Sequence, residues 1–351
     1  MIVAAIGAIS LGAGMISWYL LNRSASTKSN IGHGQIAFDI SPSGDTVVFS
    51  AGDGDIYALD LQTHGVLKVT DTNEMETTPR FHPKGVGIVF AREMPEKDGS
   101  SIFASAMDGA NARQLTRDPY VFDSSPAYSA DGSKIVFARA HRHRPYSLGG
   151  ETWDKWDIYL LMNSDGSELQ RITRQDYYIL QSPNFSIDGQ RVVYSASAIQ
   201  SSAGDTLSTL FEVGTSGREP PNIAPNDEPM LGRHAIWAAE PRLSADGSRI
   251  AFISDRQSPF HYDILISSPD GARPVAIGVA KTVSKYNQSP VFSADGQGIL
   301  FLASRTFGAG NRPVLSLWRV DTNGSNPRCI ANSRILCAAA SNQAARSAAP
   351  N

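Results

Sequence analysis

A phrase of the approximate form Pro-x-Phe-Ser-x-Asp-Gly, followed by a short apolar strand, recurs six times along the chain. Its turn glycines are residues 44, 85, 132, 189, 247 and 296, so successive copies lie 41, 47, 57, 58 and 49 residues apart. The strands that follow the turns are Val47–Phe49, Ile88–Phe90, Ile135–Phe137, Val192–Tyr194, Ile250–Phe252 and Ile299–Phe301. A supersecondary unit repeated at this period is typical of a propeller blade.

Each copy continues with a third apolar strand and then a second turn that contains glycine. Examples of these second turns are Asp108-Gly109, Asp165-Gly166, Asp270-Gly271 and Asn323-Gly324. Glycine reaches positive φ without a Cβ clash, so such turns favour β-hairpins. No clear amphipathic helix interrupts residues 35–336, which disfavours a parallel α/β fold. We therefore expect an all-β, six-bladed β-propeller of four-stranded antiparallel blades, preceded by a single N-terminal apolar helix.

The amino-acid sequence of the repeats resembles that of a known family. Phrases such as Pro290–Gly296, read with the Asp157-Ile158-Tyr159 strand, resemble the repeats of TolB-type propellers, and the resemblance covers nearly all of residues 35–336. It implies the fold more sharply than an activity, because such repeats occur in binding proteins, peptidase propellers and some sugar lyases. TolB itself has an additional α/β domain before its propeller, and residues 25–34 are too few to supply one.

The first residues have the character of a membrane segment. Ile2–Leu21 contains no charged side chain, and 20 helical residues at about 1.5 Å rise span the core of a bilayer. We expect residues 1–22 to form an uncleaved transmembrane anchor, with a cleaved signal peptide and a buried helix as alternatives. Residues 23–34 are expected to be a linker, residues 35–336 the propeller, and residues 337–351 a disordered tail.

The orientation of this anchor has two conflicting indications. Arg23 and Lys28 follow the apolar segment, which by the positive-inside rule places the propeller in the cytoplasm. The family resemblance instead implies a periplasmic or extracellular propeller, anchored or cleaved and secreted. We prefer the periplasmic or extracellular location.

Charge and cysteine content limit the partners and the compartment only weakly. The formal net charge of −3 gives no electrostatic reason to expect a nucleic acid partner. Cys329 and Cys337 are the only cysteines in the sequence, and an oxidising compartment would permit a disulfide between them. Two unbridged thiols are the preferred interpretation.

Propeller geometry divides the loops between two faces. The Asp-Gly turns fall on one face, and the variable connections fall on the other, where binding residues concentrate. The longest of these connections, Arg139–Asp157, combines cations, imidazoles and indoles, which could bind a sugar, an anionic ligand or a peptide. A solvated basic loop is the alternative. The candidate ligand-binding residues on this face are His141, Arg142, His143, Arg144, Tyr146, Trp153, Trp156, Phe260, His261, Tyr262 and Arg312.

Polar residues also stand one or two positions before the proline that is expected to open an inner strand. They are predicted to edge the central channel, where they could order water or a small ligand or serve only as polar lining. These residues are Thr77, Ser125, Gln181, Glu240 and Ser289. Arg139, at the end of a second strand, is expected to pair with Asp157, at the start of the third.

The sequence carries no catalytic signature. It lacks Gly-x-Ser-x-Gly, His-Glu-x-x-His and Cys-x-x-Cys, so no catalytic residue, cofactor or metal is predicted. We expect a non-catalytic binding scaffold of the cell envelope that engages protein, peptide or glycan through the variable-loop face. One alternative is an enzyme resembling metal-dependent oligogalacturonate lyases, with His141 or His143 joining His234 and His261. Another is the ligand-sensing domain of a membrane-anchored regulator.

Overall fold

The computed structural model describes residues 37–97, 99–141, 155–197, 208–218, 222–224, 238–257, 261–269, 273–304 and 315–331. The expected anchor, linker and C-terminal tail lie outside these ranges and stay predictions. In the described ranges, no helix is both long enough and apolar enough to cross a membrane.

The repeated phrases form antiparallel strands, as predicted, and the apolar run after each turn is buried. The first sheet consists of β1 (Phe38–Ile40), β2 (Thr46–Ser50), β3 (Ile56–Asp60) and β4 (Val66–Lys68). An eight-stranded sheet follows, made of β5 (Glu76–Phe81), β6 (Ile88–Met94), β7 (Gly99–Ser105), β8 (Arg113–Gln114), β9 (Val121–Tyr128), β10 (Ile135–His141), β11 (Trp156–Leu161) and β12 (Leu169–Arg171), with the 3-10 turn η2 (Pro95–Lys97) before β7.

Three further four-stranded sheets complete the described chain. One contains β13 (Ile179–Phe185), β14 (Arg191–Ser197), β15 (Thr209–Gly214) and β16 (Asn222–Ala224). The next contains β17 (Ala238–Leu243), β18 (Ile250–Ser254), β19 (Asp263–Ser267) and β20 (Val275–Ala276), followed by the short helix α2 (Val279–Thr282). The last contains β21 (Tyr286–Phe292), β22 (Gly298–Ser304), β23 (Leu315–Asp321) and β24 (Arg328–Ala331).

The prediction of six separate four-stranded blades is therefore wrong. Within the described ranges, four sheets have four strands each and one has eight. The eight-stranded sheet arises because β9 pairs with β7 in parallel, through Ser100 and Phe122. The Ser100 hydroxyl strengthens this junction by donating to the Asp123 carbonyl at 2.6 Å. No feature of the repeated phrase encodes such a contact, since it joins the third strand of one copy to the first strand of the next.

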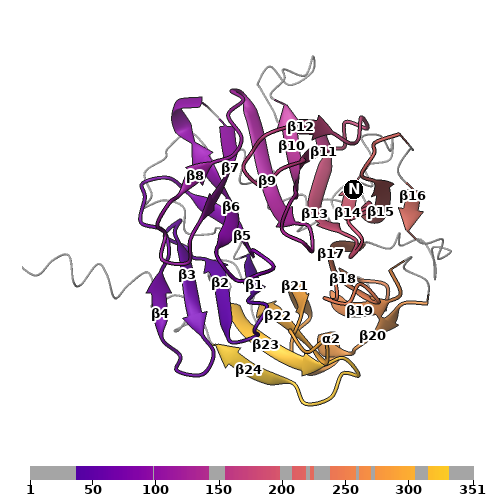
Figure 1. Ribbon diagram of the computed structural model, residues 1–351. Helices are drawn as coiled ribbons and strands as arrows, with labels where there is room; N and C mark the ends of the chain where they lie inside the picture. The colour runs from indigo at the N-terminus through magenta and orange to yellow at the C-terminus, as the bar shows by residue number, and fades with distance from the viewer. Residues whose placement is uncertain are drawn as a thin grey trace, which may run out of the picture.

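The sheets stand around a central axis, and the first strand of each repeat faces that axis (Figure 1). The ring closes by packing of the first sheet on the last. Phe38 and Phe49 share one buried apolar cluster with Leu300 and Leu302. Burial of this surface, worth about 25 cal/mol per Å², joins the two ends of the repeat array without a shared strand.

The Ser-x-Asp-Gly turns are stabilised by their own side chains. Ser129 donates its hydroxyl to Asp131 at 2.6 Å, and the Ser133 backbone N–H donates to the same carboxylate at 3.0 Å. These hydrogen bonds, the one from Ser129 first, lower the pKa of Asp131 to about 2. The equivalent serine-to-aspartate bond recurs in three other turns, from Ser186 to Asp188, from Ser244 to Asp246 and from Ser293 to Asp295.

The second turn of a repeat packs against the preceding repeat through glycine. At Gly109 (φ +77°), a Cβ atom would lie 2.0 Å from the Val69 carbonyl oxygen. Close approaches of 2.7 Å and 2.3 Å also occur from Gly166 to Leu115 and from Gly324 to Ile277, and Gly217 lies at a longer distance of 3.2 Å from Ile172. Only glycine permits the distances below 3.0 Å, so these turn glycines serve the packing of consecutive repeats as well as the hairpins.

Candidate binding site in the central channel

Five inner strands share a backbone irregularity halfway along their length. The residue before the proline has positive φ, and the register with the next strand shifts there. The residues in this conformation are Thr78, Ser125, Ser182, Glu240 and Ser289. The register shifts lie in β5, β9, β13, β17 and β21. A non-glycine residue with positive φ costs about 1–3 kcal/mol and is enriched at functional sites.

Side chains at these bulges connect neighbouring inner strands. The Thr78 hydroxyl oxygen accepts a hydrogen bond from the Ser125 backbone N–H at 3.2 Å. The Glu240 carboxylate accepts one from the Ser289 backbone N–H. Because inner-strand backbone groups at a bulge lack ladder partners, these bonds satisfy donors that would otherwise be left unpaired.

The structure places all five channel residues predicted from sequence on these inner strands. Ser125, Glu240 and Ser289 occupy the positive-φ position itself. Thr77 and Gln181 lie one residue earlier, where they pair with Ala91 and Ser195 of the next strand. The proline therefore marks the bulge, but the residue at the bulge is always its immediate predecessor.

A second set of inner-strand positions carries most of the charge in the channel. Asp39, Arg80, Asn184 and Arg242 occupy the same register position in β1, β5, β13 and β17. Arg80 Nε lies 3.4 Å from Asp39 Oδ2, and Arg242 Nη1 lies 4.0 Å from Asp39 Oδ1. Arg80 also donates from Nη2 to Asn184 Oδ1 at 3.0 Å. We call these four residues the channel cluster.

The channel cluster spans the ring. β9 lies between β5 and β13, and β21 lies between β17 and β1, so Arg80 and Arg242 each reach past an intervening inner strand (Figure 1). Contacts between strands that are not neighbours require side chains that cross the axis. The cluster therefore occupies the channel rather than the space between two sheets.

The channel cluster holds an excess of positive charge. Two guanidinium groups share the single carboxylate of Asp39, which also accepts the Phe81 backbone N–H at 2.9 Å. Burial raises the pKa of Asp39, although Arg80 acts against that rise. Arg80 Nε and Arg242 Nη1 are buried and face the Asp39 carboxylate as ion pairs, but neither atom makes a hydrogen bond within the described chain. Guanidinium donors that do not make a hydrogen bond are suited to bind carboxylates and other oxyanions.

The sequence contained a signal for this cluster that the channel prediction did not use. The position five residues before each turn glycine varies in chemistry from copy to copy. In chain order it holds Asp39, Arg80, Ala127, Asn184, Arg242 and Val291. A ring of equivalent positions that mixes charged, polar and apolar residues would have indicated a site near the axis.

Charged residues near the mouth pair across neighbouring strands, and Arg139 pairs inwards. Arg139 donates to the Asp123 carboxylate from Nε at 2.6 Å and from Nη2 at 2.8 Å. The predicted pairing with Asp157 is wrong, because Asp157 accepts instead from Arg171 at 2.6 Å. Both aspartates stand opposite Arg139 in register, one in each adjacent strand. These pairs stabilise the hairpins.

Few of the predicted mouth residues fall in the described ranges. His141 is exposed and contacts the Tyr159 hydroxyl at 2.9 Å, whereas Trp156 is 6% exposed and packs edge-on against Phe122. Tyr262 forms a bridge to Tyr286, and the adjacent His261 is half-buried. The other candidates lie outside the described residues and stay predictions: Arg142, His143, Arg144, Tyr146, Trp153, Phe260 and Arg312.

The histidine set of the lyase alternative is also only partly visible. His143 and His234 lie outside the described residues. Among the residues that the structure describes, no three His, Cys, Asp or Glu side chains are grouped closely enough to hold a metal ion.

Glu240 gives the channel a pH-dependent contribution to stability. Burial raises its pKa above the ordinary value of 4.5, against the hydrogen bonds from Ser289. The folded chain therefore keeps this proton at pH values where the unfolded chain has lost it, and its contribution to stability falls as pH rises past 4.5. Relative to the wild type, Glu240→Gln should gain free energy of unfolding between pH 4 and pH 7.5, as measured by urea titration. A difference that stays constant or moves the other way would contradict this assignment.

Comparison with known proteins agrees with this architecture. Residues 36–232, more than half of the 351 residues, match the TolB beta propeller domain family. The fold is similar to TolB from Acinetobacter baumannii, with a TM-score of 0.56 at 17% identity over 90% of this chain and 68% of that one. It is also similar to a putative TolB from Agrobacterium tumefaciens, with a TM-score of 0.56 at 19% identity over 78% of this chain and 87% of that one.

An enzyme shares the same fold. Oligogalacturonate lyase from Vibrio parahaemolyticus matches with a TM-score of 0.57 at 14% identity, over 88% of this chain and 80% of that one. At such identities the likeness is one of fold alone. The repeated phrases, the ring of antiparallel sheets and the family match together show that this chain belongs to the TolB beta propeller domain family.

Proposed function

We propose that this protein is a non-catalytic binding scaffold of the cell envelope, and that its channel takes a carboxylate-bearing segment of a protein partner. The observation that carries the proposal is the channel cluster, in which two guanidinium groups share one carboxylate and bury two donor atoms that make no hydrogen bond within the described chain. A carboxylate entering along the axis would meet both guanidinium groups. Arginine favours such planar, bidentate recognition.

The chemistry of the channel cluster suits binding better than catalysis. Its only carboxylate, Asp39, already accepts from Phe81 and contacts both arginines, so it is a poor general base. The remaining groups are hydrogen-bond donors and an amide. The family membership supports the envelope location, and the expected anchor at Ile2–Leu21 would hold the propeller at a membrane. The variable-loop face stays part of the proposal as the entrance for a partner.

The test is selection of binders from a random peptide library, followed by titration of a selected peptide. We expect enrichment of Asp and Glu. Removing one partner of a buried charged hydrogen bond costs about 2–5 kcal/mol, so Arg242→Met should weaken binding at least about 30-fold. Arg191→Met is the matched control, because the Arg191 side chain is 62% exposed and pairs only with Glu212 in the described chain.

Two results would count against this function. Selected peptides without acidic residues, bound equally by both variants, would remove the channel cluster from recognition. Binding of oligogalacturonate but of no peptide would replace the protein partner with an acidic glycan. Circular dichroism of each variant separates a loss of binding from a loss of fold.

A further inference from the structure

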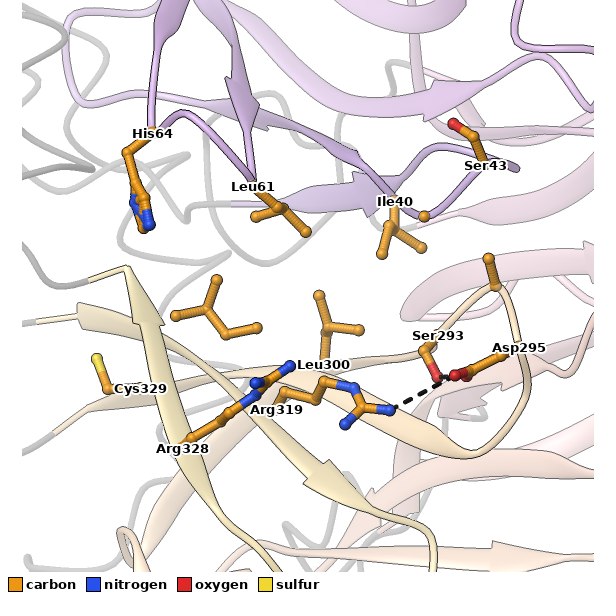
Figure 2. Close-up of a pocket in the computed structure, with 13 residues that line it drawn as sticks. Ile40, Ser43, Leu61, His64, Ser293, Asp295, Leu300, Arg319, Arg328 and Cys329 are labelled. Atoms are coloured by element: carbon orange, nitrogen blue, oxygen red, sulfur yellow. Dashed lines mark hydrogen bonds and ion pairs between the residues drawn. The ribbon is translucent and has the colours of Figure 1, made fainter.

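A cavity of about 510 Å³ lies where the ring closes, between the first and the last sheet. Its apolar walls come from Ile40 and Leu61 on one side and from Leu300 and Ile330 on the other. The Ile40 and Leu61 side chains face Leu300 (Figure 2). We call this cavity the closing pocket. Its size lies in the range of small-molecule sites, which are largely apolar with a few placed polar groups.

The closing junction differs from the other junctions in its turn. At four other junctions in the described ranges, a turn glycine sits on the preceding repeat, over a residue that stays buried: Val69, Leu115, Ile172 or Ile277. The corresponding turn of the first sheet, Asp60–Gly65, has no Asp-Gly pair and carries Leu61 and His64 into the pocket lining. Ile330, which holds the position of these buried residues on the last sheet, is only half-buried. The wall of the closing pocket therefore stays accessible.

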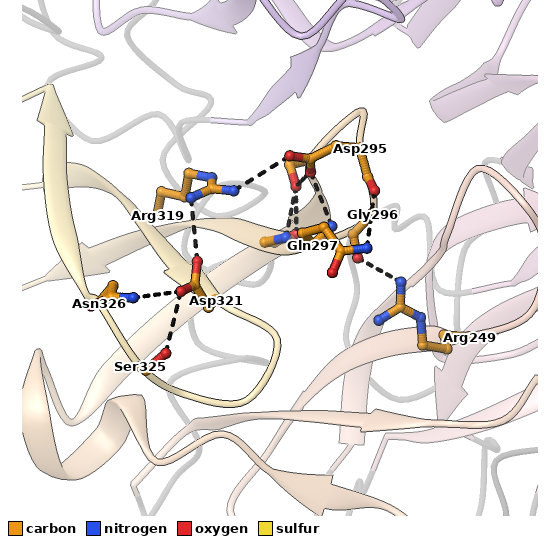
Figure 3. A network of polar contacts seen from close by, with 10 residues as sticks. Arg249, Asp295, Gly296, Gln297, Arg319, Asp321, Ser325 and Asn326 are labelled. Atoms are coloured by element: carbon orange, nitrogen blue, oxygen red, sulfur yellow. Dashed lines mark hydrogen bonds and ion pairs between the residues drawn. The ribbon is translucent and has the colours of Figure 1, made fainter.

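The polar groups of the closing pocket favour an anion. Arg319 is held by Asp295 at 3.7 Å and by Asp321 at 3.4 Å (Figure 3). Arg328 lies beside it on the neighbouring strand and makes no ion pair within the described part of the chain (Figure 2). A second cavity of about 520 Å³, on the other side of the first sheet, is lined by Asp45 and Asp60 and by no arginine. Of the two, only the closing pocket offers a cation to a ligand.

We propose that the closing pocket binds a small amphiphile with one carboxylate. The apolar body packs between Ile40, Leu61 and Ile330, and the carboxylate accepts hydrogen bonds from the Arg328 guanidinium. This site is separate from the channel cluster, so it does not depend on the function proposed above.

Cys329 supplies a direct readout, because it is exposed on the wall of the closing pocket (Figure 2). In the full chain with Cys337→Ser, Cys329 is the only thiol, and its alkylation by N-ethylmaleimide can be followed with and without decanoate. Saturating decanoate should slow alkylation at least fivefold. Arg328→Gln should raise the decanoate concentration needed for half-protection at least tenfold, and Arg191→Gln should leave it unchanged. The alkylation rate of each variant with decanoate is compared with its own rate without decanoate, because the charge of Arg328 also affects the reactivity of the neighbouring Cys329 thiol.

Several outcomes would overturn this proposal. If decanoate gives no protection, the pocket does not take the amphiphile. Equal protection by 1-decanol, or an unchanged requirement in Arg328→Gln, would show that no carboxylate is recognised. Slow alkylation that decanoate does not alter would mean that another occupant, either another segment of this chain or a second copy, already covers the wall.

Discussion

Arg139→Met should lower the free energy of unfolding by about 3–5 kcal/mol, the cost of removing one partner from a buried ion pair. The Arg139 side chain is 2% exposed, and its guanidinium makes two hydrogen bonds to Asp123, whose side chain is not exposed at all. The guanidinium also lies over the Tyr159 ring, 5.0 Å from its centroid. Methionine would fill part of the volume but leave the Asp123 carboxylate buried without a counter-charge. Urea unfolding followed by circular dichroism measures the loss.

Two further variants make the result interpretable. Arg191→Met removes an exposed arginine from the neighbouring sheet and should cost no more than about 1 kcal/mol. Adding Asp123→Asn to Arg139→Met removes the unpaired buried carboxylate and should restore part of the lost free energy of unfolding. A loss below about 1 kcal/mol in Arg139→Met, similar to that of the exposed control, would show that this pair does not hold the eight-stranded sheet together.

Gly109→Ala should be the second severe substitution. The φ of +77° alone costs an L-residue about 1–2 kcal/mol, and the new Cβ would lie 2.0 Å from the Val69 carbonyl oxygen. Backbone cannot move aside as a flexible side chain can, so the turn must lift from the first sheet, at a further cost of about 1–3 kcal/mol. We expect a total loss of about 2–5 kcal/mol in urea unfolding.

Gly85→Ala separates the two contributions. Gly85 has a similar φ of +70°, but a Cβ atom there would meet nothing within 4 Å. Its substitution should therefore cost only the conformational part, about 1–2 kcal/mol. Equal losses in the two variants would mean that the contact between Gly109 and Val69 is not a structural constraint.

The local structure followed closely from sequence, because each repeated phrase contains its own determinants. The Ser129–Asp131 turn is fixed by its own hydrogen bonds, and the strand that begins at Ile135 pairs back across that turn with Tyr128, all within a single copy. The grouping of strands into sheets did not follow. The pairing of Ser100 with Phe122 depends on how closely two consecutive repeats approach, and the repeated phrase contains no information about that distance.

The site was predicted less well, for a geometric reason. Arg139 faces an aspartate on each adjacent strand, Asp123 and Asp157, so sequence spacing could not choose between them. The channel cluster requires the ring itself, because Arg80 and Asn184 are 104 positions apart and meet only across the axis. The prolines were expected to open the inner strands, but Pro79 and Pro241 lie inside β5 and β17, directly after the bulge residues.

The claim that the channel binds a carboxylate is tested most directly by a double-mutant cycle between Arg242→Met and a Glu→Gln change in a selected peptide. If the two groups touch, the two changes together should cost less than the sum of their separate costs, with a coupling energy above about 1 kcal/mol measured by calorimetry. Costs that simply add, for every acidic position of the peptide and for Arg80→Met as well, would contradict recognition by the channel cluster.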